Sequence, residues 1–343
     1  MALSRSVPFS ILDLAPIPAG ARPGEALRNS IDLARRAEDW GFHRYWVAEH
    51  HNMPGIAASA PAVLIGHLAD ATESMRIGSG GVMLPNHPPL VVAEQFGTLE
   101  ALHPGRIDLG IGRAPGTDPA TAAALRRSAA GLSSDDFPEQ LAQLLGFFQG
   151  TFPDDHPYRR IRAVPGYGDM PALWLLGSSS YSAQVAGMLG IPFAFAHHFM
   201  PANTLAALAL YREHFRPSVV LDEPYAMVGV AVLAAPSDTE AQFLHGSNRL
   251  QMLHLRTGTP QAVPTPEEAE AYPYRASDLA VIEAATGAHI VGDAETVTRG
   301  LDDLMTATQA DEVMVTCVTF DHKSRLRSYE MVAELAGLQP PAA

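Results

Sequence analysis

The chain has a single cysteine and no long uninterrupted apolar run. Because Cys317 is alone, no disulfide can form within the chain, and cysteines cannot build a zinc site. No segment reaches the roughly eighteen consecutive apolar residues of a membrane-spanning helix, and residues 1–10 lack the basic and apolar blocks of a signal peptide. These absences lead us to expect a soluble cytoplasmic protein.

Basic side chains are also scarce. Only 23 Lys and Arg residues stand against 37 Asp and Glu residues, so the formal net charge is −14. A surface this negative repels nucleic acid and anionic lipid, which makes both improbable partners. The few arginines that follow expected strands are therefore more informative about ligand binding, because the surface as a whole is not rich in basic side chains.

Two nucleotide-binding motifs are missing, whereas a repeated βα pattern is present. No GxGxxG motif follows the first expected strand, so the sequence lacks the main indicator of a Rossmann domain. No GxxxxGK[ST] motif occurs either, so a P-loop is not indicated. Short apolar runs instead alternate with helical patterns, which is typical of a parallel sheet. The expected strands are Phe9–Leu14, Arg44–Ala48, Arg76–Met83, Ile107–Ile111, Leu173–Leu176, Pro192–Ala196, Ala226–Leu233 and Glu312–Thr316.

Eight strands favour a closed (β/α)8 TIM barrel over an open doubly wound sheet, and we expect one domain over residues 1–343. A composition that is 47% hydrophobic and 17% charged fits the large core of such a barrel. Two connections are too long for simple loops, which predicts insertions after strands 4 and 7. They are Gly131–Asp169, with a helix at Pro138–Phe148, and His245–Ile290, which we expect to form a mobile cover over the site. Its Thr257–Pro266 stretch is expected to be irregular and mobile, because Pro, Gly and Thr there leave little to pack.

The second strand runs into Glu49, His50 and His51. Titratable side chains at the C-terminal ends of barrel strands build active sites, and a histidine there suits acid–base chemistry near neutral pH. Neighbouring side chains in a strand point to opposite faces, so at most one of the two histidines can face the barrel mouth while the strand stays extended. We therefore expect a functional role for at least one, and the pattern leaves open which.

Two further strand ends point to an anion. Arg113 follows the fourth strand, and its forked guanidinium suits a phosphate or carboxylate. Ser178, Ser179 and Ser182 lie in a Gly/Ser turn that opens a helix after the fifth strand, where hydroxyls and free backbone N–H groups gather. Together they predict a phosphate clamp.

Glycines interrupt the third strand, in Ser79-Gly80-Gly81. Missing side chains in a strand permit another group to approach closely, such as a flat aromatic ring, and they also occur at bulges that only close a barrel. His197 and His198 follow the sixth strand and raise a metal-dependent hydrolase as an alternative. No HxH follows the first strand, which makes metal binding the weaker interpretation.

Together these motifs resemble the bacterial luciferase-like monooxygenase superfamily, whose members are flavin-dependent (β/α)8 barrels. The resemblance runs over nearly the whole chain, and its specificity comes from the order and spacing of the motifs. The matching segments are Trp46–His51, Val82–Pro88, Ala93–Gln95, Leu102–Arg113, Gly177–Ser179 and Ser324–Glu330.

The resemblance implies the chemistry of the site. His50 matches the base near the flavin, and Ser79, Gly80 and Gly81 fall where a non-prolyl cis peptide lies under the flavin ring. The flavin phosphate would be bound by the clamp of Arg113, Ser178, Ser179 and Ser182. The implied enzyme is a homodimeric FMN-dependent oxidoreductase that receives reduced FMN from a separate reductase. Its flavin would react with O2 to form a C4a-peroxide, which oxidises a small organic substrate.

The sequence departs from the light-emitting enzyme at two positions. Gly112 stands where luciferase has a reactive cysteine, and Ser178 stands where it has a glutamate beside the phosphate. Both departures speak against bioluminescence and against a long-chain aldehyde substrate. Two alternatives stay open within the resemblance, namely hydride transfer with the deazaflavin F420 and a flavin-binding protein without turnover.

Overall fold

The computed structural model describes residues 3–114, 116–126 and 136–340. Eight parallel strands close into a barrel in the order β1-β2-β3-β4-β5-β6-β7-β9, with β9 returning to β1. The barrel strands are β1 (Phe9–Asp13), β2 (Arg44–Val47), β3 (Arg76–Met83), β4 (Ile107–Gly112), β5 (Ala172–Gly177), β6 (Phe193–Ala196), β7 (Ala226–Ala234) and β9 (Glu312–Thr316). The predicted (β/α)8 barrel is confirmed, and these strands coincide with the eight expected ones to within a few residues.

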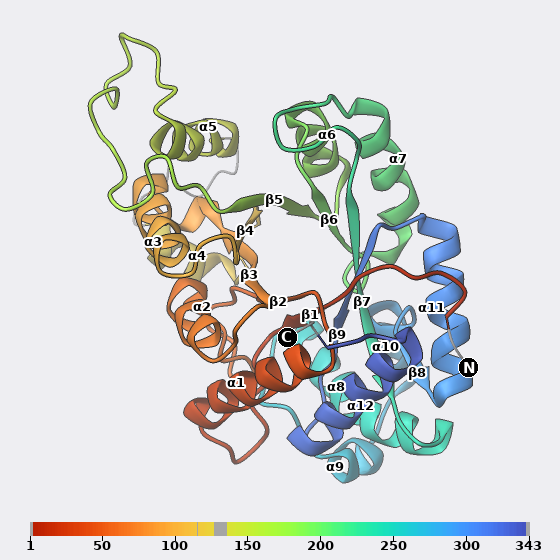
Figure 1. Cartoon of the computed structure of the whole chain (residues 1–343). Helices are drawn as coiled ribbons and strands as arrows, with labels where there is room; N and C mark the ends of the chain where they lie inside the picture. Colours follow the sequence, from red (N-terminus) through yellow and green to blue (C-terminus); the bar gives the residue numbers. More distant parts are fainter. Residues whose placement is uncertain (1–2, 115, 127–135, 341–343) are drawn as a thin grey trace.

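A ninth strand, β8 (Ile290–Gly292), pairs only with the C-terminal part of β7. Helices surround the barrel strands (Figure 1). They are α1 (Pro23–Asp39), α2 (Pro61–Asp70), α3 (Pro89–Leu102), α4 (Pro119–Arg126), α5 (Phe137–Gln149), α6 (Ser180–Leu189), α7 (Thr204–His214), α8 (Asp238–Arg256), α9 (Pro266–Ala271), α10 (Ala276–Thr286), α11 (Ala294–Thr308) and α12 (His322–Ala336). The 3₁₀ turn η1 (Leu84–Asn86) follows β3, and the 3₁₀ turn η3 (Pro201–Asn203) precedes α7.

Proline and glycine mark helix boundaries. Proline occupies the first turn of α1, α2 and α3, where its missing N–H removes no helical hydrogen bond. Gly190 ends α6 in the left-handed conformation at φ +63°, which a side chain would strain. Such local signals explain why helix and strand limits were predictable from the sequence.

The barrel interior has a charged base and an apolar middle. At the base, Arg44 donates to Asp108 at 2.6 Å and to Glu312 at 2.7 Å, and Arg76 donates to the other oxygen of Asp108 at 2.6 Å. Two arginines thus balance the charges of the two buried carboxylates. Above this network the inward side chains are apolar, and they fill the barrel. They are Leu12, Trp46, Ala48, Trp174, Ala194, Met227 and Met314.

The two long connections are partly helical. Between β4 and β5 the chain forms α4 and α5, and residues 150–171 then extend away from the barrel (Figure 1); part of the expected Gly131–Asp169 segment, residues 131–135, lies outside the described residues. Between β7 and β9 lie α8, α9, α10, β8 and α11.

Thr257–Gln261, between α8 and α9, contains no helix or strand. Val263 is fully buried, and its N–H and C=O bond with Ile17 and Ala19 in the loop after β1. The expectation that little of Thr257–Pro266 packs is therefore wrong for its C-terminal part, because Val263, Pro264 and Pro266 are buried. The exposed part is Thr257–Gln261.

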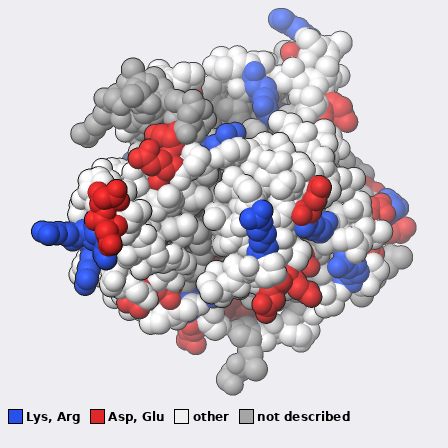
Figure 2. All heavy atoms as spheres, turned by 90° about the horizontal axis from the view of Figure 1, so that it is seen from above, with Lys and Arg blue, Asp and Glu red and all other residues white. Residues whose placement is uncertain are grey.

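Charged side chains are distributed without a continuous basic area on the face drawn in Figure 2, where both signs occur in small separate groups. No helix among the described residues is long and apolar enough to cross a membrane.

Candidate active site

The inward face of β2 leads directly to His50. Arg44 and Trp46 point into the barrel, where they bond to Asp108, and Ala48 belongs to the same interior cluster. With a period of two residues, the next inward position is His50. Its Nδ1 lies 3.3 Å from the carbonyl oxygen of Gly116, and no described residue forms a hydrogen bond with its Nε2.

The ring of His51 instead bonds to a neighbouring side chain. Its Nε2 lies 2.9 Å from Oε1 of Glu49, and its side chain is only 15% exposed.

Burial lowers the pKa of His50 from its usual value of 6.5, so the ring is neutral at pH 7. Among the described residues, the two rings thus differ in their partners: His51 bonds to the buried carboxylate of Glu49, whereas His50 contacts only the carbonyl oxygen of Gly116.

Glu49 organises the strand ends around these histidines. Its buried carboxylate accepts hydrogen bonds from the backbone N–H of Met83 at 2.9 Å and from Asn86 Nδ2 at 3.1 Å, and Nε2 of His87 lies 2.9 Å away. Burial alone would raise the pKa of Glu49, but the hydrogen bonds from His51 and His87 outweigh it and lower the pKa to about 2. This role was missed in the sequence, where Glu49 appeared only as the residue before the histidine pair.

The glycine segment of β3 is distorted as expected. The β3–β4 register shifts between Gly80 and Val82, and the Gly80–Gly81 peptide is cis. A Cβ on Gly80 would meet Leu12 at 2.7 Å, and one on Gly81 would meet the carbonyl oxygen of Gly110 at 2.7 Å. Both glycines are thus required by packing within the barrel, whatever binds above them.

Ser79 faces its neighbour strand. Its hydroxyl donates to the carbonyl of Gly110 and accepts from the N–H of the same residue, both at 3.0 Å, and the side chain is fully buried. Ser79 therefore fastens β3 to β4 beside the cis peptide and has no exposed hydroxyl for a ligand.

Arg113 and the N-terminus of α6 come together, as the phosphate clamp requires. Arg113 follows β4, and its guanidinium carbon lies 4.4 Å from the centre of the Tyr181 ring in the first turn of α6. Ser179 is the N-cap residue of α6 and makes no side-chain capping bond. Ser178 directly precedes this N-cap residue. Ser182 lies in the first turn of α6, and its side chain is buried, with 4% of its surface exposed.

These residues fit a phosphate. Arg113 forms no ion pair with any described carboxylate, so its charge is not neutralised within the part of the chain that the structure resolves. The first N–H groups of α6 have no helical acceptor, because the four N-terminal donors of a helix never do. A guanidinium beside such a helix end is a suitable site for a dianion.

Three further histidines, of which His245 is buried and His198 and His289 are partly buried, lie near the strand ends opposite β2. Nδ1 of His198, after β6, lies 3.1 Å from the carbonyl of Gly229, and Nε2 of His245 lies 3.1 Å from Nδ1 of His289. Burial lowers the pKa of His245 to about 4 and that of His289 to about 3, so both are neutral at physiological pH. Sequence reasoning missed His245 and His289, which are 44 residues apart and meet only in the fold.

The histidines do not form a metal centre in the described structure. Within residues 3–114, 116–126 and 136–340, no three or more His, Cys, Asp or Glu side chains are arranged to hold a metal ion. His197 bonds instead to the hydroxyl of Thr204 at 2.8 Å.

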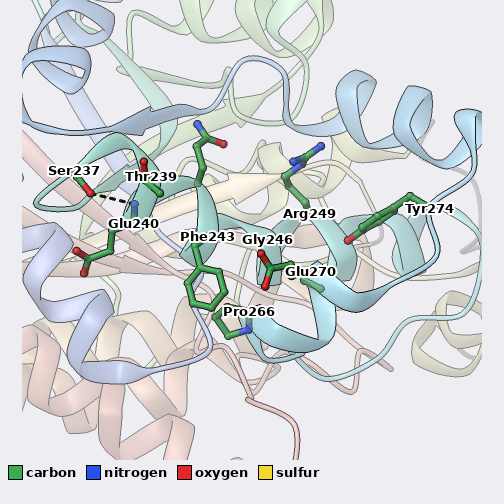
Figure 3. Close-up of a pocket in the computed structure, with 11 residues that line it drawn as sticks. Ser237, Thr239, Glu240, Phe243, Gly246, Arg249, Pro266, Glu270 and Tyr274 are labelled. Atoms are coloured by element: carbon green, nitrogen blue, oxygen red, sulfur yellow. Dashed lines mark hydrogen bonds between the residues drawn. The ribbon is translucent and has the colours of Figure 1, made fainter.

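Two surface clefts lie outside this constellation. One of about 600 Å³ is formed by α8, α9 and Tyr274, with Phe243 and Arg249 on its wall (Figure 3). Another of about 610 Å³ lies between η1 and α5. Neither is lined by His50, Arg113 or the serines of α6, so the candidate site is defined by its convergent polar groups and not by cavity size.

A closed barrel of eight parallel strands, with titratable side chains at the C-terminal ends of the strands, is the architecture of (β/α)8 barrel enzymes. Comparison with known proteins makes this specific. Residues 7–312 match the family described as Luciferase-like monooxygenase, and the chain belongs to this family. It is accordingly an oxidoreductase.

Characterised and uncharacterised relatives cover most of the chain. A luciferase-like monooxygenase of Escherichia coli (strain K12) is 49% identical over 96% of this chain and 97% of its own length. The N-acetyl-S-alkylcysteine monooxygenase of Bacillus subtilis (strain 168) is 40% identical over 77% of this chain and 78% of its own length.

Solved structures share the fold. The crystal structure of apo-MsnO8 has a TM-score of 0.89 at 38% identity and covers 98% of this chain and all of its own. Two more distant structures share the fold alone. A type II Baeyer-Villiger monooxygenase component in complex with FMN has a TM-score of 0.72 at 18% identity, covering 98% of this chain and 99% of its own. An F420-dependent secondary alcohol dehydrogenase has a TM-score of 0.67 at 17% identity, covering 97% of this chain and 99% of its own.

Proposed function

We propose that the protein is an FMN-dependent monooxygenase that uses reduced flavin and O2 to oxidise a small organic substrate. The observation that carries the proposal is the meeting of Arg113 with the free N-terminus of α6 at the strand ends of a barrel of this family. Arg113 would bind the FMN phosphate together with Ser178, Ser179 and Ser182.

The remaining site residues would orient the flavin ring and move protons. Gly80 and Gly81, without side chains, would leave the bulge of β3 open to a flat ring, and Ser79 would hold that bulge against β4. Reduced FMN, when bound, supplies the electrons that activate O2. The neutral ring of His50 would accept a proton at Nε2, while its Nδ1 stays directed at Gly116.

Reduced flavin would come from a separate flavin reductase, as the resemblance to this family implies. We also expect a homodimer, which light scattering coupled to size-exclusion chromatography would test. The name of the Bacillus subtilis relative makes N-acetyl-S-alkylcysteines the first substrates to try.

The proposal is tested by adding FMN, NADH and a flavin reductase to the protein under air. We expect FMN binding by fluorescence titration, and substrate-dependent product that carries one oxygen atom from ¹⁸O2. Tight FMN binding without turnover of any candidate substrate would favour a flavin-binding protein without catalysis.

Hydride transfer with F420 is the alternative, because the same clamp also suits the phosphate of that cofactor. Product formation with reduced F420 under argon, together with weak FMN binding, would replace the proposal by this alternative.

A further inference from the structure

Arg113 is held by an aromatic ring, and no described carboxylate pairs with it. Its guanidinium lies over the face of Tyr181 at 4.4 Å. A ring face attracts a cation through its quadrupole and leaves the N–H groups at the edge of the guanidinium free to bond elsewhere. The contact thus fixes the arginine without consuming its capacity for an anion.

The ring of Tyr181 is itself fixed. Tyr181 belongs to the first turn of α6 and packs against the hydrophobic core, where its ring meets Phe137 of α5 edge-on with ring centres 6.4 Å apart. Phe137 is 1% exposed and cannot move freely. Phe137 of α5 therefore restricts the ring of Tyr181, and this ring in turn packs against the guanidinium of Arg113.

We propose that Tyr181 is a positioning residue for the phosphate clamp, one that pre-orders Arg113 beside the N-terminus of α6. This inference rests on the proposed binding of a phosphorylated flavin. An arginine side chain loses considerable rotamer freedom when it binds, and a ring that holds it in place before binding reduces that loss. Tyr181 would thereby strengthen binding of phosphorylated flavin without touching the flavin ring.

The experiment compares FMN with riboflavin, which lacks the phosphate, by fluorescence titration of the full-length protein. Tyr181→Leu should weaken FMN binding by roughly three- to tenfold, the range of a cation–π contact, and leave riboflavin binding unchanged. Tyr181→Phe keeps the ring and should bind FMN within about twofold of the wild type. If Tyr181→Leu lowers the melting temperature, Tyr181→Met replaces it.

A double-mutant cycle tests whether the effect passes through Arg113. In the Arg113→Ala background, Tyr181→Leu should cause no further loss of FMN affinity, because the ring then has no guanidinium to hold. The matched control is Tyr167→Leu. It removes an equivalent ring, 4.6 Å from the guanidinium of Arg162 in the segment after α5, and should leave FMN binding unchanged.

Several outcomes would overturn the inference. Unchanged FMN affinity in Tyr181→Leu, or an equal loss for FMN and riboflavin, would show that the ring does not act through the phosphate clamp. A loss in Tyr181→Phe equal to that in Tyr181→Leu would assign the effect to the hydroxyl. Failure of the wild-type protein to bind FMN would refute the proposed function, whereas an effect of Arg113→Ala without one of Tyr181→Leu would refute only this inference.

Discussion

The two adjacent histidines after β2 should respond differently to substitution. His50→Asn keeps an amide near the position of Nδ1, so the contact with Gly116 at 3.3 Å can persist while the titratable ring is lost. We expect FMN affinity to change little, because among the described residues the ring of His50 bonds to Gly116 and to none of the clamp residues. Turnover should fall by roughly 10²–10⁴, the usual contribution of a general acid or base.

His51→Asn should show the opposite behaviour. Its ring bonds to the buried Glu49 carboxylate at 2.9 Å, and removing a hydrogen bond to a charged group costs about 1.5–3 kcal/mol. The free energy of unfolding should fall by that amount, with a smaller effect on turnover of the folded protein. Urea denaturation and steady-state kinetics separate the two effects.

The pH dependence provides a second measurement on His50. Burial lowers its pKa below 6.5, so the neutral ring that acts as a base is present above that lowered value. Activity should therefore persist below pH 6.5 and fall only at more acidic pH, and His50→Asn should remove this limb. Equal losses of turnover in His50→Asn and His51→Asn, or unfolding of His50→Asn, would mean that both histidines only brace the loop.

Three other predictions concern the clamp, Glu49 and the cover segment. Arg113→Ala should weaken FMN binding by about 1.5–3 kcal/mol but spare riboflavin, and an unchanged FMN dissociation constant in fluorescence titration would remove Arg113 from the site. Glu49 has a folded pKa of about 2, below its unfolded value of 4.5, so its contribution to stability is present above pH 4.5 and lost as the pH falls toward 2. Glu49→Gln should lower stability at pH 7 and flatten this acid limb in urea titrations, and a limb equal to that of the wild type would contradict the assignment. Limited proteolysis should cut first within Thr257–Gln261, the exposed stretch between α8 and α9, and bound flavin should slow the cut; first cleavage elsewhere would exclude this stretch as the mobile part of a cover.

Local signals were sufficient for the barrel, and they placed the residues of the predicted clamp at neighbouring strand ends. Most of the strands are short apolar runs with a proline or glycine close to one end, and these features act over a few residues. Arg113 and the Ser178–Ser182 turn were predictable as partners because consecutive parallel strands end at the same edge of a sheet. The structure confirms their proximity through the contact of Arg113 with Tyr181 at 4.4 Å.

The sequence by itself thus determined the fold class, and it predicted the strand ends and the residues, Arg113 with Ser178, Ser179 and Ser182, of the proposed anion clamp. Only the tertiary structure decided how the two adjacent histidines differ, because that depends on the partner each ring meets, Glu49 for His51 and Gly116 for His50. The tertiary structure also shows why positions 80 and 81 are glycines, because Leu12 and Gly110 leave no room there for a Cβ. These facts depend on contacts between residues far apart in the chain, and no local pattern records which distant side chain fills the space beside a given residue.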